Sequence, residues 1–219
     1  WGADHHGYVP RMKSALQAMG YDENVFKVML IQFVSLKRNG EKVSMSTRSG
    51  EFETLADVFK EVGVDATRFF FLMRSSDTHL DFDLELAKKT SADNPVFYIQ
   101  YAHARICSIF RTATEQRINL RDSADLDLSP LKNEEELVMM KKILSFTEVI
   151  EKSAELLEVH RVPFYLQDLV GTFHRYYSRN RIISDDRALS FARLFLMNCL
   201  RVTICNGLSL MGVSSPERM

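Results

Sequence analysis

The chain has 219 residues, 46% of them hydrophobic, and its 28 basic and 29 acidic side chains leave a net charge of −1. This composition supports a buried core and argues against disorder. No run of about 18 apolar residues is present, so the sequence predicts no membrane span. The three cysteines, Cys107, Cys199 and Cys205, lie in apolar stretches without metal-ligand spacing. They predict buried reduced thiols, no bound metal and a cytoplasmic protein.

The first 50 residues predict a loop, a helix and a hairpin in that order. A glycine- and histidine-rich loop precedes an amphipathic helix over 9–19, which Gly20 ends. Val25–Leu36 is rich in β-branched and large apolar residues and predicts a strand, and Asn39-Gly40 predicts a hairpin turn after it. A Ser/Gly-rich loop follows over 44–50. Small residues let a backbone approach phosphate closely, so the two loops indicate a nucleotide site at one edge of an α/β sheet.

The next segment predicts two short helices and a connector. Thr54 with Asp57 is typical of a helix N-terminal cap and predicts a helix to about Val62. Asp65 is expected to cap a second helix through Arg74. Residues 75–94 are polar with a partly alternating apolar pattern, and they predict a connector that ends in a short helix.

From Asn94 and Pro95, a cap followed by proline at the first helical position, the chain is predicted to be helical. Four apolar stripes at helical spacing begin near Ile99, Met140, Leu166 and Ala188. They predict a bundle of four amphipathic helices, with a domain boundary near 90–95.

Charge is distributed unevenly along this bundle. Residues 122–158 hold ten acidic residues against four lysines, whereas residues 160–207 hold seven arginines against three aspartates, with no lysine or glutamate. A segment with arginines but no lysines is better explained by bidentate phosphate contacts and stacking on bases than by a role in solubility alone. The near-neutral total therefore conceals a polarised molecule with a candidate nucleic-acid surface.

Four stretches together resemble the bacterial-type arginyl-tRNA synthetases, a class I family. They are the loop and helix over 2–13 (GADHHGYVPRMK), the 44–50 loop, residues 94–105 (NPVFYIQYAHAR) and the final 207–219 (GLSLMGVSSPERM). The resemblance implies a mainly α chain in which a remnant of a Rossmann-type α/β catalytic domain (1–50) is followed by a stem-contacting connector (51–93). A DALR-type helical anticodon-binding domain then covers 94–219.

The resemblance also implies what the whole protein does. Enzymes of this family activate arginine with ATP and Mg²⁺ and esterify it to tRNA(Arg), and they are usually monomers. The chain opens on Trp1 and contains neither the family's upstream His-Ile-Gly-His-type motif nor its N-terminal tRNA domain. We therefore expect a C-terminal part that binds tRNA without catalysing aminoacylation alone.

The first candidate site is the loop of Gly2, Asp4 and His5, which resembles the Gly-x-Asp-Gln-like motif that contacts the ATP ribose in class I synthetases. Glycine allows close backbone approach, and the carboxylate can accept hydrogen bonds from ribose hydroxyls. The alternative is that His5 and His6 cap the helix after them. A zinc site is disfavoured because adjacent loop histidines rarely point at one ion.

The second candidate site, over 44–48, aligns with the class I Lys-Met-Ser-Lys-Ser loop, although Ser44 and Thr47 replace both lysines. The resemblance implies adenine contacts by the backbones of Val43 and Met45. Ser46 is expected to bind phosphate, and Arg48 to supply positive charge for the pyrophosphate leaving group. The alternative for Arg48 is a solvated loop cation.

The third candidate site combines aromatic and basic residues of the bundle, which suit stacking and edge recognition of unpaired bases. Tyr177 falls on an apolar stripe and is predicted to be core, whereas its neighbour Tyr176 lies off the stripe. The predicted tRNA contacts are Tyr98, Tyr101, Arg105, His174, Arg175, Tyr176, Arg179, Arg181 and Met219.

Other interpretations stay open at this point. Each arginine is equally explained as a solvated residue or an ion-pair partner within the bundle. The chain as a whole could be a stand-alone tRNA-binding module or a helical interaction domain without an RNA role. Another class I enzyme, such as the cysteinyl one, is disfavoured because no cysteine–zinc arrangement is present.

Overall fold

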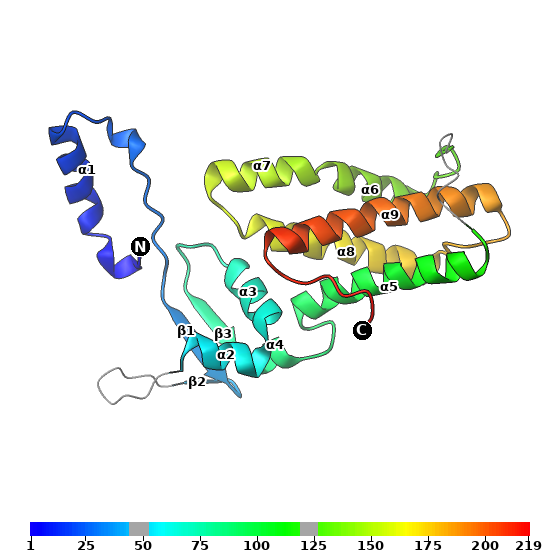
Figure 1. Cartoon of the computed structure of the whole chain (residues 1–219), viewed down its shortest axis with the longest axis horizontal. Coiled ribbons are helices and arrows are strands. Elements are labelled where there is room, and N and C mark those ends of the chain that lie inside the picture. The colour runs from blue at the N-terminus through cyan, green and yellow to red at the C-terminus, as the bar shows by residue number, and fades with distance from the viewer. Residues whose placement is uncertain (44–52, 119–126) are drawn as a thin grey trace.

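The computed structural model describes residues 1–43, 53–118 and 127–219 and has three parts. Figure 1 shows an N-terminal helix standing apart, a small sheet flanked by short helices, and a long helical bundle. The prediction of a mainly helical chain with a small α/β remnant is confirmed. Val43 is described, whereas Met45, Ser46 and Arg48 lie outside the described residues.

The N-terminal part consists of η1 (Ala3–His5), α1 (Tyr8–Ala18) and η2 (Glu23–Val25). The predicted helix is confirmed, and Gly20 with φ of 85° follows its end. No residue of α1 is buried. The predicted strand over Val25–Leu36 is wrong for most of its length, because regular pairing begins only at Val34.

A three-stranded sheet has the order β2-β1-β3. Strand β1 (Val34–Arg38) pairs antiparallel with β2 (Glu41–Lys42) and parallel with β3 (Leu80–Asp83). Asn39 and Gly40 both have positive φ (53° and 81°), the conformation of a type I′ hairpin turn, so the predicted turn is confirmed. Residues 80–83 fall within the predicted connector, and β1, the partner that makes them a strand, lies more than 40 residues upstream.

Helices α2 (Leu55–Val62), α3 (Val64–Leu72) and α4 (Leu84–Lys88) surround the sheet. The predicted cap is confirmed, because Thr54 and Asp57 form a reciprocal capping box. The predicted cap at Asp65 is wrong: α3 begins after Gly63, whose φ is 86°, and Asp65 lies in the first turn. The Asp65 carboxylate instead accepts hydrogen bonds from Gln100 and Ser214.

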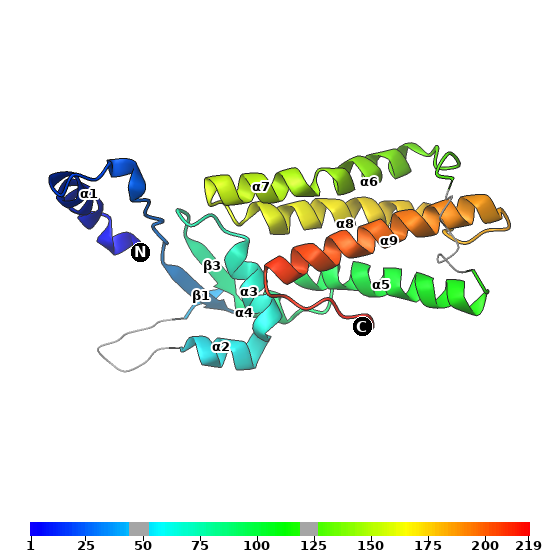
Figure 2. The same ribbon diagram turned by 45° about the horizontal axis from the view of Figure 1, so that its top comes forward.

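The bundle consists of α5 (Pro95–Glu115), α6 (Glu134–Leu144), α7 (Phe146–Leu156), α8 (Arg161–Arg179) and α9 (Arg187–Leu210). Asn94 caps α5 and Pro95 occupies its first turn, as predicted. The stripe that begins near Met140 belongs to two helices, because the chain turns at Ser145. The described residues therefore contain five bundle helices where four were predicted. Figures 1 and 2 show α6 and α7 end to end, alongside α8, α9 and α5.

One continuous core joins the sheet to the bundle. Phe69 of α3 and Phe82 of β3 are fully buried in the same cluster as Ile99 and Leu166 of the bundle. The predicted domain boundary near 90–95 coincides with the passage from α4 to α5, but apolar contacts continue across it. By length and composition alone α9 could cross a membrane, and 44% of its most apolar window is buried inside the protein.

A buried polar network holds the bundle together around Glu136, which is 1% exposed. Tyr176 Oη donates to Glu136 Oε1 at 2.6 Å, and Arg193 Nε donates to the same oxygen at 2.8 Å. The backbone N–H of Asn133 donates to Oε2 at 3.1 Å within a capping box. Burial and the hydrogen bond to Glu136 raise the pKa of Tyr176, which therefore stays a neutral donor. The carboxylate thus ties α6 to α8 and α9.

We predict that Glu136→Ala lowers the free energy of unfolding by about 3–5 kcal/mol, because it leaves the buried Arg193 guanidinium without its partner. The neighbouring Glu135→Ala is the matched control. Glu135 pairs with Arg179, whose side chain is 69% exposed, so its loss is expected to stay within about 1 kcal/mol. Urea denaturation of both variants checks the prediction, and equal losses would contradict it.

Candidate nucleic-acid interface

Helices α5 and α8 bring a set of aromatic rings together on one side of the bundle. Tyr98 and Tyr101 lie one turn apart on α5, and both meet His174 of α8. The ring centroid of His174 is 4.4 Å from that of Tyr98 and 6.0 Å from that of Tyr101, with which it is nearly parallel. Phe97 stacks on Tyr101 at 6.1 Å. The rings form an aromatic layer between the two helices.

Arg105 extends this layer by one further turn of α5. Its guanidinium carbon lies 4.8 Å from the centroid of the Tyr101 ring and 5.1 Å from that of Tyr177. Its Nη2 also donates to the Tyr101 hydroxyl. The planar cation therefore lies against two aromatic rings, an arrangement that orders an arginine without neutralising it.

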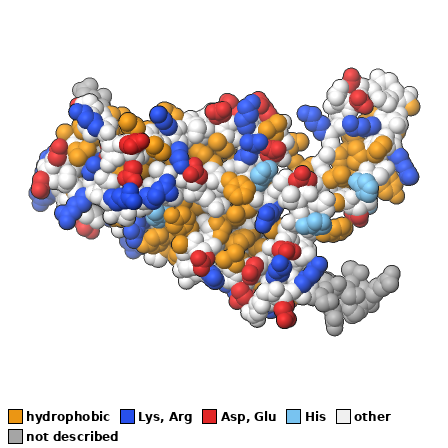
Figure 3. Space-filling view, turned by 180° about the vertical axis from the view of Figure 1, so that it is seen from behind, with side chains coloured by type: hydrophobic (Ala, Val, Ile, Leu, Met, Phe, Trp, Pro, Cys, Tyr) orange, Lys and Arg blue, Asp and Glu red, His pale blue; other side chains and the backbone are white. Residues whose placement is uncertain are grey.

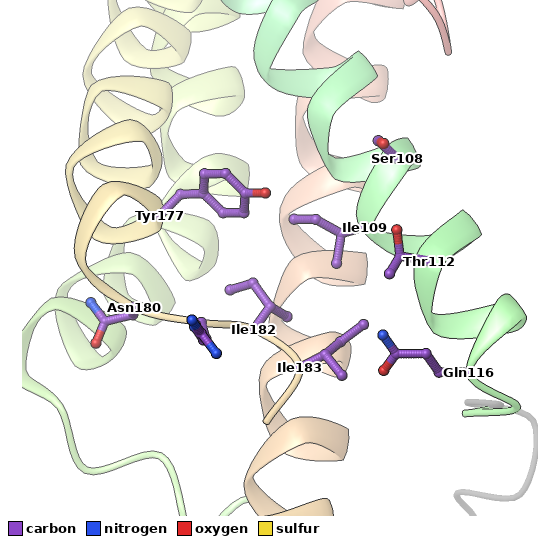
Figure 4. A pocket seen from close by; sticks show the side chains of 9 residues that line it. Ser108, Ile109, Thr112, Gln116, Tyr177, Asn180, Ile182 and Ile183 are labelled. Atoms are coloured by element: carbon purple, nitrogen blue, oxygen red, sulfur yellow. The ribbon is translucent and has the colours of Figure 1, made fainter. Parts of the chain in front are cut away.

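Two adjoining cavities open beside this stack. The first has a volume of about 500 Å³ and includes Tyr101, Arg105, Arg111, Tyr177, Arg218 and Met219 in its lining. The second, about 360 Å³, lies further along α5 and shares Ser108 and Tyr177 with the first. Figure 4 shows its walls: Ser108, Ile109, Thr112 and Gln116 come from α5, and Tyr177, Asn180, Ile182 and Ile183 from α8 and the segment after it. We call the two cavities together the α5/α8 groove.

The C-terminal segment completes the groove by running back along α5. Gly212, with φ of 64°, turns the chain at the end of α9. Ser214 then bonds to Asp65, and Gln100 Nε2 donates to Asp65 Oδ2 at 2.8 Å and to the Ser214 carbonyl at 2.9 Å. These contacts carry the last residues onto the middle of α5 (Figure 1).

Two further side chains of α5 hold this segment by its backbone. The His103 ring nitrogen Nδ1 lies 2.9 Å from the Pro216 carbonyl, and Arg111 Nη1 donates to the Glu217 carbonyl at 3.2 Å. Arg218 and Met219 consequently reach the groove, and Met219 remains 55% exposed there.

The arginines of the groove have no carboxylate partners. Among the described residues, no ion pair includes Arg105, Arg111, Arg181 or Arg218. Some basic side chains elsewhere on the bundle are paired, as in Lys142–Asp168 and Arg179–Glu135. Figure 3 shows lysine and arginine side chains gathered near the bundle end away from the sheet, beside hydrophobic ones. The groove thus combines aromatic surface with uncompensated positive charge.

The structure divides the predicted tRNA-binding residues into two sets. Tyr101, Arg105 and Met219 line the first cavity, and Arg181 lines the second. Tyr98 and His174 form the aromatic layer next to them. On α8, by contrast, Arg175 donates to Thr172, which also binds Lys142 of α6, and Arg179 pairs with Glu135 of α6. Arg175 and Arg179 therefore lie on a different side of α8 from the groove.

The burial of the two adjacent tyrosines of α8 is the reverse of the burial predicted from the sequence. The prediction that Tyr176 lies off the buried stripe is wrong, because its side chain is fully buried and bonded to Glu136. Tyr177, predicted to be core, is half-buried and lines both cavities. Apolar periodicity alone could not show which of the two tyrosines is buried. The burial of Tyr176 depends on the distant Glu136 carboxylate, which accepts a hydrogen bond from its hydroxyl.

The predicted nucleotide loop lies at the other end of the molecule. Asp4 and His5 are exposed side chains 3.7 Å apart, and a Cβ on Gly2 would come within 2.5 Å of Asp4 Oδ1. His5 lines an open cavity of about 340 Å³ with Trp1, Tyr8 and Met12. The alternative that His5 and His6 cap α1 is wrong, because its N-cap is Gly7 without a side-chain bond.

The second nucleotide loop is described only at its start. The Val43 backbone N–H donates to the Leu36 carbonyl at 2.9 Å, so this donor is used within the hairpin. The roles predicted for Met45, Ser46 and Arg48 stay predictions. Among the described residues, no group of three or more His, Cys, Asp or Glu side chains is placed to hold a metal ion.

The protonation state of His174 matters for the aromatic layer. Burial lowers the pKa of this imidazole below its ordinary value, and the nearby Arg105 acts in the same direction, while a hydrogen bond with the Tyr98 carbonyl opposes them. The ring is therefore kept neutral near pH 7. A neutral ring can stack on its neighbours without repelling the guanidinium beside it.

This lowered pKa predicts a pH-dependent stability. The unfolded chain binds a proton at His174 near pH ~6.5, whereas the folded chain binds it only at lower pH, so acidification through this window destabilises the fold. We expect the free energy of unfolding to fall less between pH 7.5 and 5.5 in His174→Phe than in the wild type, because the variant has no imidazole at this position to take up a proton on unfolding. Urea denaturation at both pH values measures this, and an identical fall in the two proteins would contradict the assignment.

Comparison with known proteins agrees with this arrangement. Residues 99–219 match the family model described as the DALR anticodon binding domain. Over the whole chain, the sequence is 53% identical to an arginine–tRNA ligase of Syntrophotalea carbinolica and 54% identical to one of Citrifermentans bemidjiense. The chain spans about 40% of the length of each of these curated relatives.

Solved structures show the same fold. A chain from Campylobacter jejuni assigned as an arginyl-tRNA synthetase superposes with a TM-score of 0.88 at 35% identity, covering 100% of this chain and 47% of that one. The Thermus thermophilus arginyl-tRNA synthetase shares the fold with a TM-score of 0.73 at 24% identity, covering 94% of this chain and 38% of that one. The helical bundle and the segment folded along it place the chain in the DALR anticodon binding domain family.

Proposed function

We propose that the α5/α8 groove binds the unpaired anticodon bases of tRNA(Arg). The observation that carries the proposal is the Tyr101–Arg105–Tyr177 stack, which lines open cavities together with arginines that have no carboxylate partner among the described residues. Unpaired bases are bound by stacking on aromatic and guanidinium planes and by hydrogen bonds to their edges. Both kinds of group are present side by side.

Each part of the groove has a distinct role in this proposal. The half-buried ring of Tyr177 and the guanidinium of Arg105 offer flat surfaces to a base. Gln116 supplies an amide donor and acceptor in the second cavity, where it can read a base edge. The Asn180 amide lines the same cavity but is held by Asn133, Glu135 and the Tyr176 carbonyl. The flexible thioether side chain of Met219 closes the first cavity from the side of the C-terminal segment.

For the whole protein, we propose the activity named for the curated relatives, the ligation of arginine to its tRNA. ATP, bound with Mg²⁺, and arginine would then be substrates, and the protein would be a cytoplasmic monomer. In this proposal 1–50 belong to the catalytic domain, 51–93 contact the tRNA stem, and 94–219 bind the anticodon. The residues of this chain alone are expected to bind tRNA without activating arginine.

The N-terminal loop fits part of ATP in this proposal. The exposed Asp4 carboxylate, next to His5, can accept hydrogen bonds from ribose hydroxyls. The adenine is assigned to the backbones of Val43 and Met45 on the strength of the family resemblance. The phosphate end of the nucleotide is assigned to Ser46 and Arg48 on the strength of the family resemblance.

The test of anticodon binding is a titration of the protein with arginine tRNA across a series of salt concentrations. A matched transcript carries a changed middle anticodon base. We expect affinity to fall steeply with salt, because several phosphates are contacted. It should also fall about 10-fold with the base change, because hydrogen bonds to the edge of the middle base are lost while stacking is kept. Affinity that is indifferent to the anticodon would overturn the proposal.

A second prediction separates the groove from the rest of the arginine-rich sequence. Tyr177→Leu and Arg105→Gln are each expected to weaken tRNA binding about 10-fold, since each removes one stacking plane worth ~1–3 kcal/mol. Arg179→Gln, close by on α8 but paired with Glu135, is the control and should change the affinity less than about 2-fold. Filter binding or fluorescence anisotropy measures all three, with circular dichroism to verify folding. Equal losses at Arg105 and Arg179 would mean that charge density, not the groove, determines binding.

A further inference from the structure

A separate arginine pocket is lined by α5, α9 and the C-terminal segment. It has a volume of about 380 Å³, and its lining includes Arg111 of α5, Arg201 of α9 and Arg218 of the C-terminal segment, together with Phe110, Cys107 and Glu217. Three basic side chains from three different segments thus converge on one cavity. Among the described residues none of these arginines forms an ion pair.

Arg201 is held in place before any ligand arrives. Its Nη2 donates to Asn198 Oδ1 at 3.0 Å, and its guanidinium carbon lies 5.7 Å from the centroid of the Phe110 ring. Its Nε is buried and has no hydrogen-bond partner among the described residues. An unsatisfied buried donor on a charged group is costly, so the folded protein carries a donor that an anionic acceptor would satisfy.

The other groups of the pocket leave its positive charge uncompensated. Arg111 uses Nη1 on the Glu217 carbonyl, which fixes its position without neutralising it. Burial raises the pKa of the Cys107 thiol, so this group adds no negative charge. Glu217 is the one carboxylate of the lining, and it is exposed. With three arginines against one glutamate, the cavity favours an oxyanion.

We propose that this pocket binds a backbone phosphate of the same RNA strand whose bases occupy the α5/α8 groove. The reason for choosing RNA is continuity, because Arg111 and Arg218 line both the pocket and the first cavity of the groove. A strand whose bases stack on Tyr177 and Arg105 can therefore continue across the C-terminal segment with a phosphate over Arg201. This inference rests on the proposed anticodon binding and adds a phosphate anchor to it.

The test compares the salt dependence of tRNA binding in variants of the pocket. For Arg201→Gln and Arg218→Gln we expect the slope of log K against log salt to become shallower by about 0.7–0.9 each, the loss of one phosphate contact. Affinity at moderate salt should fall about 10-fold. In Arg201→Gln, a change outside the α5/α8 groove, the discrimination against the changed anticodon base should stay as in the wild type. Glu217→Gln should raise the affinity, because it removes the competing carboxylate.

Arg161→Gln is the matched control, because Arg161 pairs with Glu158 at the start of α8, outside the pocket. It should leave slope and affinity unchanged. Arg218 is exposed, so its variant tests the proposal even if Arg201→Gln does not fold. A wild-type slope in Arg218→Gln, together with unchanged affinity in Glu217→Gln, would overturn the proposal. Binding of inorganic phosphate to the pocket would not rescue it, because the tRNA phosphate would then not be bound there. Failure of the anticodon proposal is distinct, since there the wild type itself would not discriminate the changed base.

Discussion

The buried carboxylate of Glu136 is the constraint on which the functional face of the bundle depends. A charge with 1% exposure is tolerated only with partners, and its two partners on other helices are Tyr176 of α8 and Arg193 of α9. Directing Tyr176 inward fixes the rotation of α8. Its neighbours His174 and Tyr177 are then turned toward α5, where the aromatic layer and the groove form.

The same network also reaches the segment after α8. Arg193 Nη1 donates to the Arg181 carbonyl at 2.7 Å, and Asn133 Nδ2 donates to Asn180 Oδ1 at 3.2 Å. The walls of the second cavity are thus placed by polar groups that never enter it. A change in the buried network should therefore disturb base recognition at a distance, through the orientation of α8 and not through lost contact with the ligand.

Local signals in the sequence predicted the parts of this structure that local chemistry determines. Thr54 with Asp57, Asn39-Gly40 and Asn94-Pro95 all act within a few residues, and each was located correctly. Strand β3, the turn at Ser145 and the inward rotation of Tyr176 depend on partners distant in sequence, and they were missed. For the candidate site, the residue types were predictable, whereas their division between the groove and the α6 side of α8 required the three-dimensional arrangement.

The C-terminal segment is attached to α5 mainly through its own peptide groups. The carbonyls of Ser214, Pro216 and Glu217 receive contacts from Gln100, His103 and Arg111, whereas the side chains of Glu217, Arg218 and Met219 are exposed. Every residue has a peptide carbonyl. Attachment through these groups therefore does not depend on which side chains the segment carries. The segment can consequently diversify at its last positions while keeping its path, and ligand preference can evolve there at little cost to folding.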